Sequence, residues 1–141
     1  MHRGLQVAKP YGDSARYDFL VDSGASLRHR QIISRIQVKS VSVPNGCSYR
    51  VTLSRGGGRK TGYRRCDLDY IAAYVIPHHA WYIIPIAAVA GLKSVRLCPH
   101  RRSRGRLEIY RSAWSLLGRV QGQHLTISSL GIKAAGGEVF R

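Results

Sequence analysis

Acidic residues are scarce in this chain of 141 residues. Seven Asp and Glu stand against 23 Lys and Arg, which gives a formal net charge of +16 at pH 7, and eighteen of the cations are Arg. A polyanionic partner is favoured by such an imbalance, because each neutralised phosphate releases condensed counterions. Arginine also offers a planar fork that binds phosphate through two hydrogen bonds. The composition therefore predicts a nucleic-acid partner, and the alternative is a genome-wide drift towards arginine at solvated positions.

Cysteine is also rare, and its spacing excludes two classes of small domain. Cys47, Cys66 and Cys98 are odd in number and far apart, and no CxxC pair occurs. Neither a zinc ribbon nor a disulfide framework is indicated. The first residues, MHRGLQVAKP, lack the apolar segment of a signal peptide, so we expect a cytoplasmic protein with reduced thiols.

The sequence has no uninterrupted apolar run long enough to cross a membrane. Its most apolar stretch, Ile71 to Leu92, contains Pro77-His78-His79 near the middle and Pro85 soon after. A bilayer-spanning helix would have to bury the histidines and break at both prolines. We therefore expect no membrane partner, and we expect two buried strands joined by a turn.

The chain has the length of one ordinary domain and contains several alternating segments. These segments predict strands, which cover residues 16–22, 32–43, 69–76 and 81–84. The turn sequence Pro44-Asn45-Gly46, followed by alternation from Ser48 to Leu53, predicts a hairpin. No internal repeat is visible.

Two segments favour helices. Residues 86–92 form a short helical candidate, and Leu107 to Leu117 has a helical pattern that ends at Gly118. In the second segment the apolar residues that fall on one side are Ile109, Ala113, Leu116 and Leu117. We expect one domain over residues 1–118 and a C-terminal tail over 119–141.

Three polar residues are expected to meet on one face of the sheet. Gln37 and Lys39 are two apart on a strand, so they point the same way about 7 Å from each other, and Asp18 joins them if its strand pairs antiparallel with theirs. A carboxylate, an amide oxygen and the backbone carbonyl of Val38 would suit a hard cation such as Mg²⁺. Lys39 could stabilise a developing phosphorane charge or act as a base. On spacing alone, a solvated strand face with polar side chains explains the same pattern.

Six segments, which follow one another along residues 5–118, resemble the sequences of one known protein family. They are VAKPYGDSARYDFLVD at 7–22, IQVKS at 36–40, SYRV at 48–51, LDYIAAYVIP at 68–77, WYIIPI at 81–86 and YRSAWSLL at 110–117. Together they resemble the PD-(D/E)XK nucleases of the group I intron-associated endonuclease type.

This resemblance implies an α/β (α+β) fold with a mixed sheet of about four to five strands flanked by helices. It also implies hydrolysis of DNA, most of all double-stranded DNA, with Mg²⁺ or Mn²⁺ and no small-molecule cofactor, often in a homo-oligomer. The family's catalytic positions fall on Asp18, Gln37 and Lys39, and its metal ligands on Asp18, Gln37 and the Val38 carbonyl.

The sequence departs from the family pattern at three places. Relatives have a Glu-bearing helix before the segment that matches residues 4–10, and Gln37 occupies a position where many relatives carry an acid. Asp18 would then be the only carboxylate among the ligands, so we expect the metal to bind weakly. Residues 29–34 also resemble an insertion into a tight hairpin. The alternative function is therefore a catalytically impaired, basic nucleic-acid-binding domain derived from such a nuclease.

Several cations are candidates for contacts with the nucleic-acid backbone. They are Arg16, Arg55, Arg59, Lys60, Arg64 and Arg65. Tyr63 beside them could stack on a base or pack in the core, and Trp81 and Trp114 are expected in the core.

The remaining acids and histidines are expected to have structural roles. Asp13 and Asp22 flank Asp18 as spare ligands, although a turn-capping role suits Asp13 better. Asp67 and Asp69 are expected to cap a turn or to pair with Arg64 and Arg65. His78 and His79 are expected to be exposed in their turn.

Overall fold

The computed structural model describes residues 5–12, 14–25, 30–54, 61–100 and 105–118. The predicted C-terminal tail at 119–141 lies outside them, as do Asp13, Arg55, Arg59 and Lys60.

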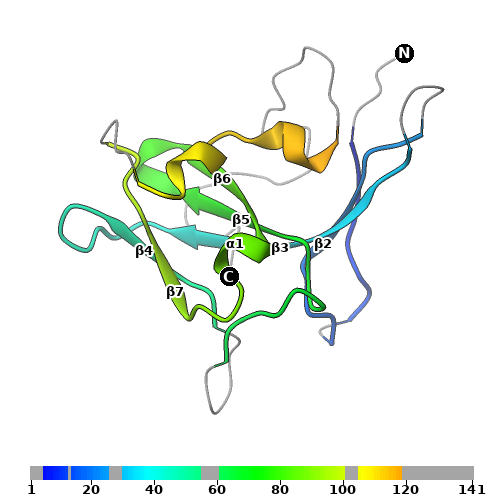
Figure 1. Ribbon diagram of the computed structural model, residues 1–141, viewed down its shortest axis with the longest axis horizontal. Coiled ribbons are helices and arrows are strands. Elements are labelled where there is room, and N and C mark those ends of the chain that lie inside the picture. The colour runs from blue at the N-terminus through cyan, green and yellow to red at the C-terminus, as the bar shows by residue number, and fades with distance from the viewer. Residues whose placement is uncertain (1–4, 13, 26–29, 55–60, 101–104, 119–141) are drawn as a thin grey trace.

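A mixed five-stranded sheet forms the centre of the molecule (Figure 1). Its strands, in spatial order, are β1 (Gln6–Ala8), β2 (Phe19–Asp22), β3 (Ile33–Val41), β5 (Tyr70–Val75) and β6 (Ala80–Pro85). The pair β3–β5 is parallel, and the other three pairs are antiparallel. The predicted mixed sheet is therefore confirmed, including the antiparallel pairing of the Asp18 segment with the Gln37 strand.

A second sheet of two antiparallel strands corrects the predicted hairpin. It consists of β4 (Tyr49–Thr52) and β7 (Ser94–Leu97), which are far apart in sequence. The predicted turn is present, because Asn45 and Ser48 form a bridge, but β4 does not pair with β3. β5 pairs with β3 from Ile36 to Val41, whereas β2 pairs with its other edge only from Ile33 to Ile36. β4 pairs with β7 instead and leaves the rest of that edge open.

The core lies on both faces of the main sheet. One cluster fills the space between the main sheet and the two-stranded sheet, with Ile71 and Tyr82 on one side and Val51 and Leu97 on the other. The second cluster, on the opposite face, includes Val38, Trp81 and Leu117, and Trp114 packs against it. Both tryptophans thus belong to the core as expected. The alternation of β3 places Ile36 and Val38 in this second cluster and Gln37 and Lys39 on the opposite face.

Helices are few and short. They are η1 (Ile76–His78), α1 (Ile86–Val89), η2 (Glu108–Tyr110) and η3 (Trp114–Leu117), of which only α1 is α-helical. The predicted helical segment at 86–92 is confirmed in α1. Within the described ranges the main sheet is therefore covered mainly by the small sheet and by 3-10 turns.

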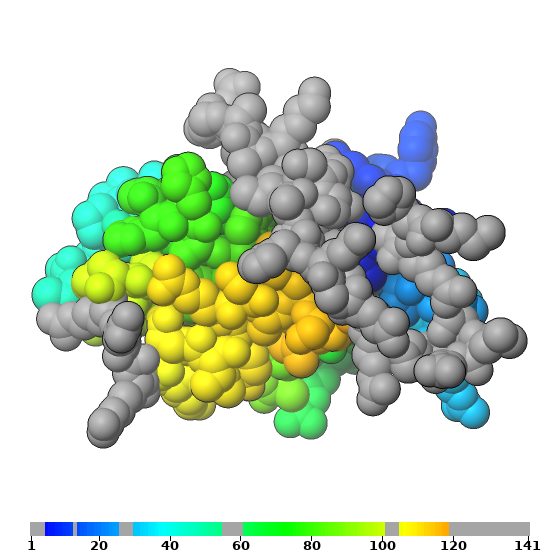
Figure 2. Space-filling view, turned by 90° about the horizontal axis from the view of Figure 1, so that it is seen from above, coloured from blue at the N-terminus to red at the C-terminus, as the bar shows by residue number. Residues whose placement is uncertain are grey.

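The helix predicted from Leu107 to Leu117 is wrong. Two short 3-10 turns occupy the segment, separated by Ser112 with φ 52°. Arg111 forms a bridge with Tyr82, and the Ser112 amide donates to the Trp81 carbonyl. The segment thus runs along the edge of β6 and does not form an α-helix. The side chain of Ile109 is 75% exposed as a result. Figure 2 shows residues 105–118, in yellow and orange, packed beside the green strands.

The apolar stretch from Ile71 to Leu92 folds as predicted. It forms β5 and β6 joined by η1, followed by α1. No helix in the described residues has the length and apolar character that a membrane crossing needs.

Candidate active site

The site begins where β2 stops covering the edge of β3. The last paired residues are Phe19 and Ile36, and the Asp18 amide still donates to the Ile36 carbonyl at 2.9 Å. Beyond this point the Val38 amide has no strand opposite it. It donates instead to the Asp18 carboxylate oxygen Oδ2 at 2.8 Å. The Asp18 side chain therefore takes the place of a strand partner and is fixed by the backbone of β3.

Gln37 meets the same carboxylate from the adjacent position. Its Nε2 donates to Asp18 Oδ2 at 2.7 Å, and both residues are half-buried. This hydrogen bond orients the amide and leaves its oxygen, Oε1, available as an acceptor. Asp18 Oδ1 likewise accepts no hydrogen bond within the described part of the chain. Two oxygens of the predicted ligand set are thus free at one place.

Lys39, two residues further along β3, lies above the ring of Tyr63. Its Nζ is 5.9 Å from the ring centroid, within the range of a cation–π contact. Tyr63 is only 5% exposed and belongs to the cluster beneath the two-stranded sheet. Of the two roles considered for Tyr63, the structure therefore places it in the core, where it supports the Lys39 ammonium.

Close packing of two glycines holds Tyr63 in place. The Gly91 amide donates to the Tyr63 carbonyl at 3.0 Å. A side chain on Gly62 would meet the Gly91 carbonyl carbon at 2.6 Å, so this approach requires glycine. The segment that carries Tyr63 is thus anchored to the turn after α1.

The residues at the open edge fit a hard divalent cation. Mg²⁺ prefers oxygen donors and retains several waters, and the site offers the Asp18 carboxylate and the Gln37 amide oxygen. The amide and carbonyl of one strand residue point to the same edge, so the Val38 carbonyl lies on the side of its Asp18-bound amide. Among the described residues, no three His, Cys, Asp or Glu side chains gather into a metal site. The carboxylate that the described residues bring to this donor set is that of Asp18.

A buried carboxylate ties the segment before Asp18 to the segment after Tyr63. Asp67, 4% exposed, forms an ion pair with Arg16 and accepts from the Arg64 amide at 2.9 Å. The turn-capping role expected for Asp67 is thus confirmed, but its charged partner is Arg16. An unpaired buried carboxylate would be costly. The pair therefore helps to fix the approach of the chain to Asp18, a role that the sequence did not reveal.

A second ion pair joins the starts of the parallel strands β3 and β5. Asp69 accepts from Arg35 Nη2 and Nε, both at 3.1 Å, and from the Arg35 amide at 2.7 Å. Burial alone would raise the pKa of Asp69, but these hydrogen bonds and the guanidinium charge outweigh it and lower the pKa. The expected pairing with Arg64 or Arg65 is therefore wrong, and Arg35 is the partner.

The other predicted residues are distributed around this centre. Arg64 and Arg65 are exposed, whereas Arg55, Arg59 and Lys60 lie outside the described residues. Asp22 caps a turn: it accepts from the Gly24 amide at 2.8 Å and from Gln31. It is therefore engaged away from Asp18.

The two histidines at the end of η1, His78 and the C-cap residue His79, are only partly as expected. His79 is exposed but bonds the Tyr74 hydroxyl at 3.0 Å, while His78 is half-buried and bonds the Tyr49 hydroxyl at 3.2 Å. Both thus have structural partners.

Comparison with known proteins points to one family. The family described as PD-(D/E)XK endonuclease matches residues 1–117. The solved structure of a bacterial homing endonuclease, I-Ssp6803I, superposes with a TM-score of 0.65 at 29% sequence identity, covering 80% of this chain and 78% of that chain. A comparison with curated proteins gave no match.

Proposed function

The chain belongs to the PD-(D/E)XK endonuclease family, and we propose that it is a divalent-metal-dependent endonuclease acting on double-stranded DNA. The observation that carries this proposal is the arrangement at the open edge of β3: Asp18 accepts hydrogen bonds from Gln37 and Val38, and Lys39 follows on the same face of the strand. A carboxylate and an amide oxygen converge there beside a supported ammonium group.

In the proposed reaction, water attacks the phosphorus of a phosphodiester, and one P–O bond forms while another breaks. The products are a phosphate monoester and an alcohol. A bound Mg²⁺ or Mn²⁺ would polarise the phosphate and lower the pKa of its water. Asp18, Gln37 and the Val38 carbonyl would hold that cation.

Lys39 supplies a fixed positive charge where the phosphorane accumulates negative charge. Electrostatic stabilisation of this kind is most effective when the donor is placed before the reaction begins. The Tyr63 ring under Nζ provides this placement. Exposed Arg64 and Arg65, close in sequence to Tyr63, are suited to the DNA backbone.

A catalytically impaired, nucleic-acid-binding domain is the second candidate function. It is favoured by the single carboxylate of the donor set, because a hard cation is held weakly by one formal negative charge. This candidate retains the basic surface and predicts binding without metal-dependent products.

Cleavage of supercoiled plasmid separates the two candidates. We expect nicking by the purified protein with Mg²⁺ or Mn²⁺, no nicking in EDTA, and loss of at least about a hundredfold in rate for Lys39→Ala, as for other single electrostatic groups. Lys9→Ala, which removes an exposed lysine beside β1, is the matched control and should cleave normally. Cleavage that survives Lys39→Ala would remove Lys39 from the mechanism, and binding without any nicking would favour the second candidate.

A further inference from the structure

The two-stranded sheet β4–β7 presents two arginines directly opposite each other. Arg50 and Arg96 are partners in the antiparallel register, and both are exposed. Thr52 and Ser94 form the next pair. Because side chains alternate along a strand, these four residues share the outward face, while the inward residues are buried in the core.

This arrangement is unfavourable for the protein alone. Like charges directly opposite on two strands destabilise the pair. The carboxylates of the described residues have other partners. The only arginines that form ion pairs within the described residues are Arg16 and Arg35. Nothing in the described part of the chain therefore neutralises Arg50 and Arg96, so an acceptor from outside would relieve their repulsion.

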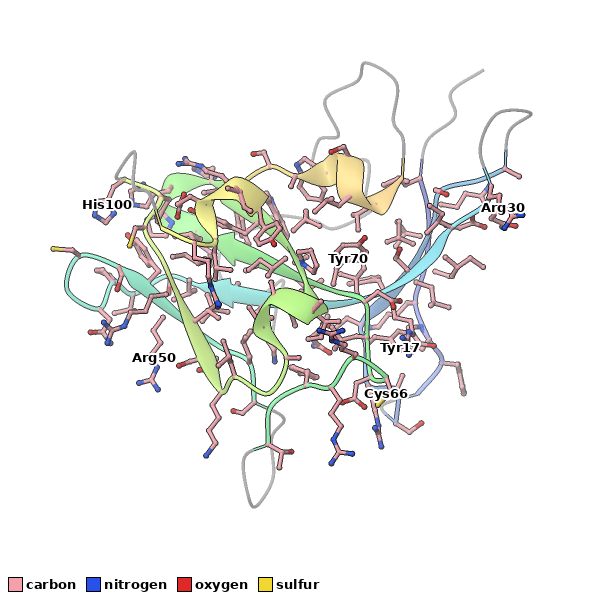
Figure 3. All side chains as sticks on the ribbon, viewed as in Figure 1. Tyr17, Arg30, Arg50, Cys66, Tyr70 and His100 are labelled. Atoms are coloured by element: carbon pink, nitrogen blue, oxygen red, sulfur yellow. The ribbon has the colours of Figure 1, made fainter. Side chains whose placement is uncertain are left out.

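The Arg50 guanidinium is oriented by its neighbour. Its Nε donates to the Ser94 hydroxyl at 3.1 Å, which leaves the two terminal nitrogens to donate outward. Arg96 and Ser94 also line a shallow hollow together with Arg106. Figure 3 shows Arg50 on the outside of the small sheet, at the opposite end of the molecule from Arg30.

The outward face of β4–β7 and the Asp18 site lie on the same side of the main sheet. Gln37 and Lys39 project from the face on which Val41 packs against the cluster under the small sheet. Tyr63, which supports Lys39, belongs to that same cluster. A duplex lying at the open edge of β3 would therefore pass beside the small sheet.

We propose that the outward face of β4–β7 enters the major groove of double-stranded DNA, where Arg50 and Arg96 donate to acceptors on the edges of the bases. The major groove accommodates a two-stranded β-ribbon, and an arginine fork matches O6 and N7 of guanine. This inference rests on the proposed function, since it names the surface through which the endonuclease holds its substrate.

Binding to two forms of one duplex tests the proposal in EDTA, without cleavage. One form is unmodified, and in the other every cytosine carries a glucosylated 5-hydroxymethyl group that fills the major groove. We expect Arg50→Gln/Arg96→Gln to bind the unmodified duplex about 10- to 100-fold more weakly than the wild type, the loss typical of arginine contacts to bases. Glucosylation should weaken the wild type to a similar extent and leave this variant nearly unchanged.

Two further variants control for charge and folding. Lys9→Gln/Arg30→Gln removes the same charge from two exposed residues outside the small sheet, next to β1 and β3, and should remain sensitive to glucosylation. Arg50→Lys/Arg96→Lys keeps the charge but lacks the planar fork, and should recover only part of the affinity that the glutamine variant loses. Circular dichroism and the thermal midpoint verify that each variant is folded.

The outcomes separate this inference from the proposed function. Equal loss on both duplexes would show a general electrostatic contact and overturn the major-groove assignment, as would an unchanged affinity of Arg50→Gln/Arg96→Gln. A wild type that shows the expected binding pattern but never cleaves would overturn the proposed function and leave this surface intact.

Discussion

Gln37 is the residue on which the strength of the proposed metal site depends most. It contributes an amide oxygen at a position where an acid would add a second negative charge, and its Nε2 is bound to Asp18 at 2.7 Å. The Gln37 amide oxygen is thus a neutral ligand where a carboxylate would bind the cation more tightly. Substitutions at this position can change the metal requirement without removing Lys39.

Gln37→Glu should lower the Mg²⁺ concentration for half-maximal cleavage about tenfold, because affinity follows the charge of the ligands. Without metal, the new carboxylate would face Asp18, so we expect a lower thermal midpoint in EDTA that Mg²⁺ restores. A Mg²⁺ titration of the cleavage rate measures the first effect. Gln37→Met, which removes the oxygen at similar volume, should raise the requirement. An identical Mg²⁺ dependence in all three proteins would exclude Gln37 as a ligand.

The contact of Asp18 with Gln37, and the position of Lys39 on the same face of β3, could be expected from the sequence. Alternation on β3 determines which side chains share a face, and one antiparallel pair brings Asp18 to Gln37. Tyr63 under Lys39 and the Arg16–Asp67 pair were not accessible in this way. They join segments separated by 24 and 51 positions through tertiary packing, which a local pattern does not encode.

At the level of elements, the Arg35–Asp69 pair aligns the parallel strands that carry the site. Parallel pairing lacks a tight turn to set its register, and here the ion pair lies where both strands start. The Asp69 carboxylate has a lowered pKa because the contacts with Arg35 outweigh the effect of burial. It therefore stabilises the folded state at pH values above its ordinary pKa, 3.8, and this contribution is lost as pH falls through the lower folded value.

Asp69→Asn should consequently lower the urea midpoint at pH 7, and the difference from the wild type should shrink towards pH 3. Parallel urea titrations at the two pH values measure it. Asp22→Asn serves as the control, since the described partners of Asp22 are Gly24 and Gln31 and involve no arginine. A difference that stays constant from pH 7 to pH 3 would contradict the stabilising role of the ionised carboxylate.

Element prediction failed where tertiary contacts competed with local periodicity. The pattern from Leu107 to Leu117 is helical, but the Glu108 carboxylate accepts from the Tyr82 hydroxyl at 3.1 Å and from the Cys98 amide at 3.2 Å. These contacts hold the segment against β6 and β7. The short strands β1 and β7 were missed because three or four residues carry too little alternation to be recognised.

On the scale of the whole molecule, the chain carries a net charge of +16. Within the described residues the ion pairs involve only Arg16 and Arg35, so few of the cations there are neutralised by a carboxylate. Part of the surplus lies on the outward face of β4–β7, on the same side of the main sheet as Asp18 and Lys39. The proposed binding surface and the proposed active site therefore lie on one side of the main sheet.

Single-turnover cleavage of a DNA duplex by Asp18→Asn, over a range of Mg²⁺ concentrations, tests the central claim most directly. The amide keeps the size of the side chain but removes its charge, so we predict duplex binding in EDTA equal to the wild type and no metal-dependent product at any Mg²⁺ concentration. Wild-type rates of cleavage by Asp18→Asn would contradict the placement of the active centre at the open edge of β3.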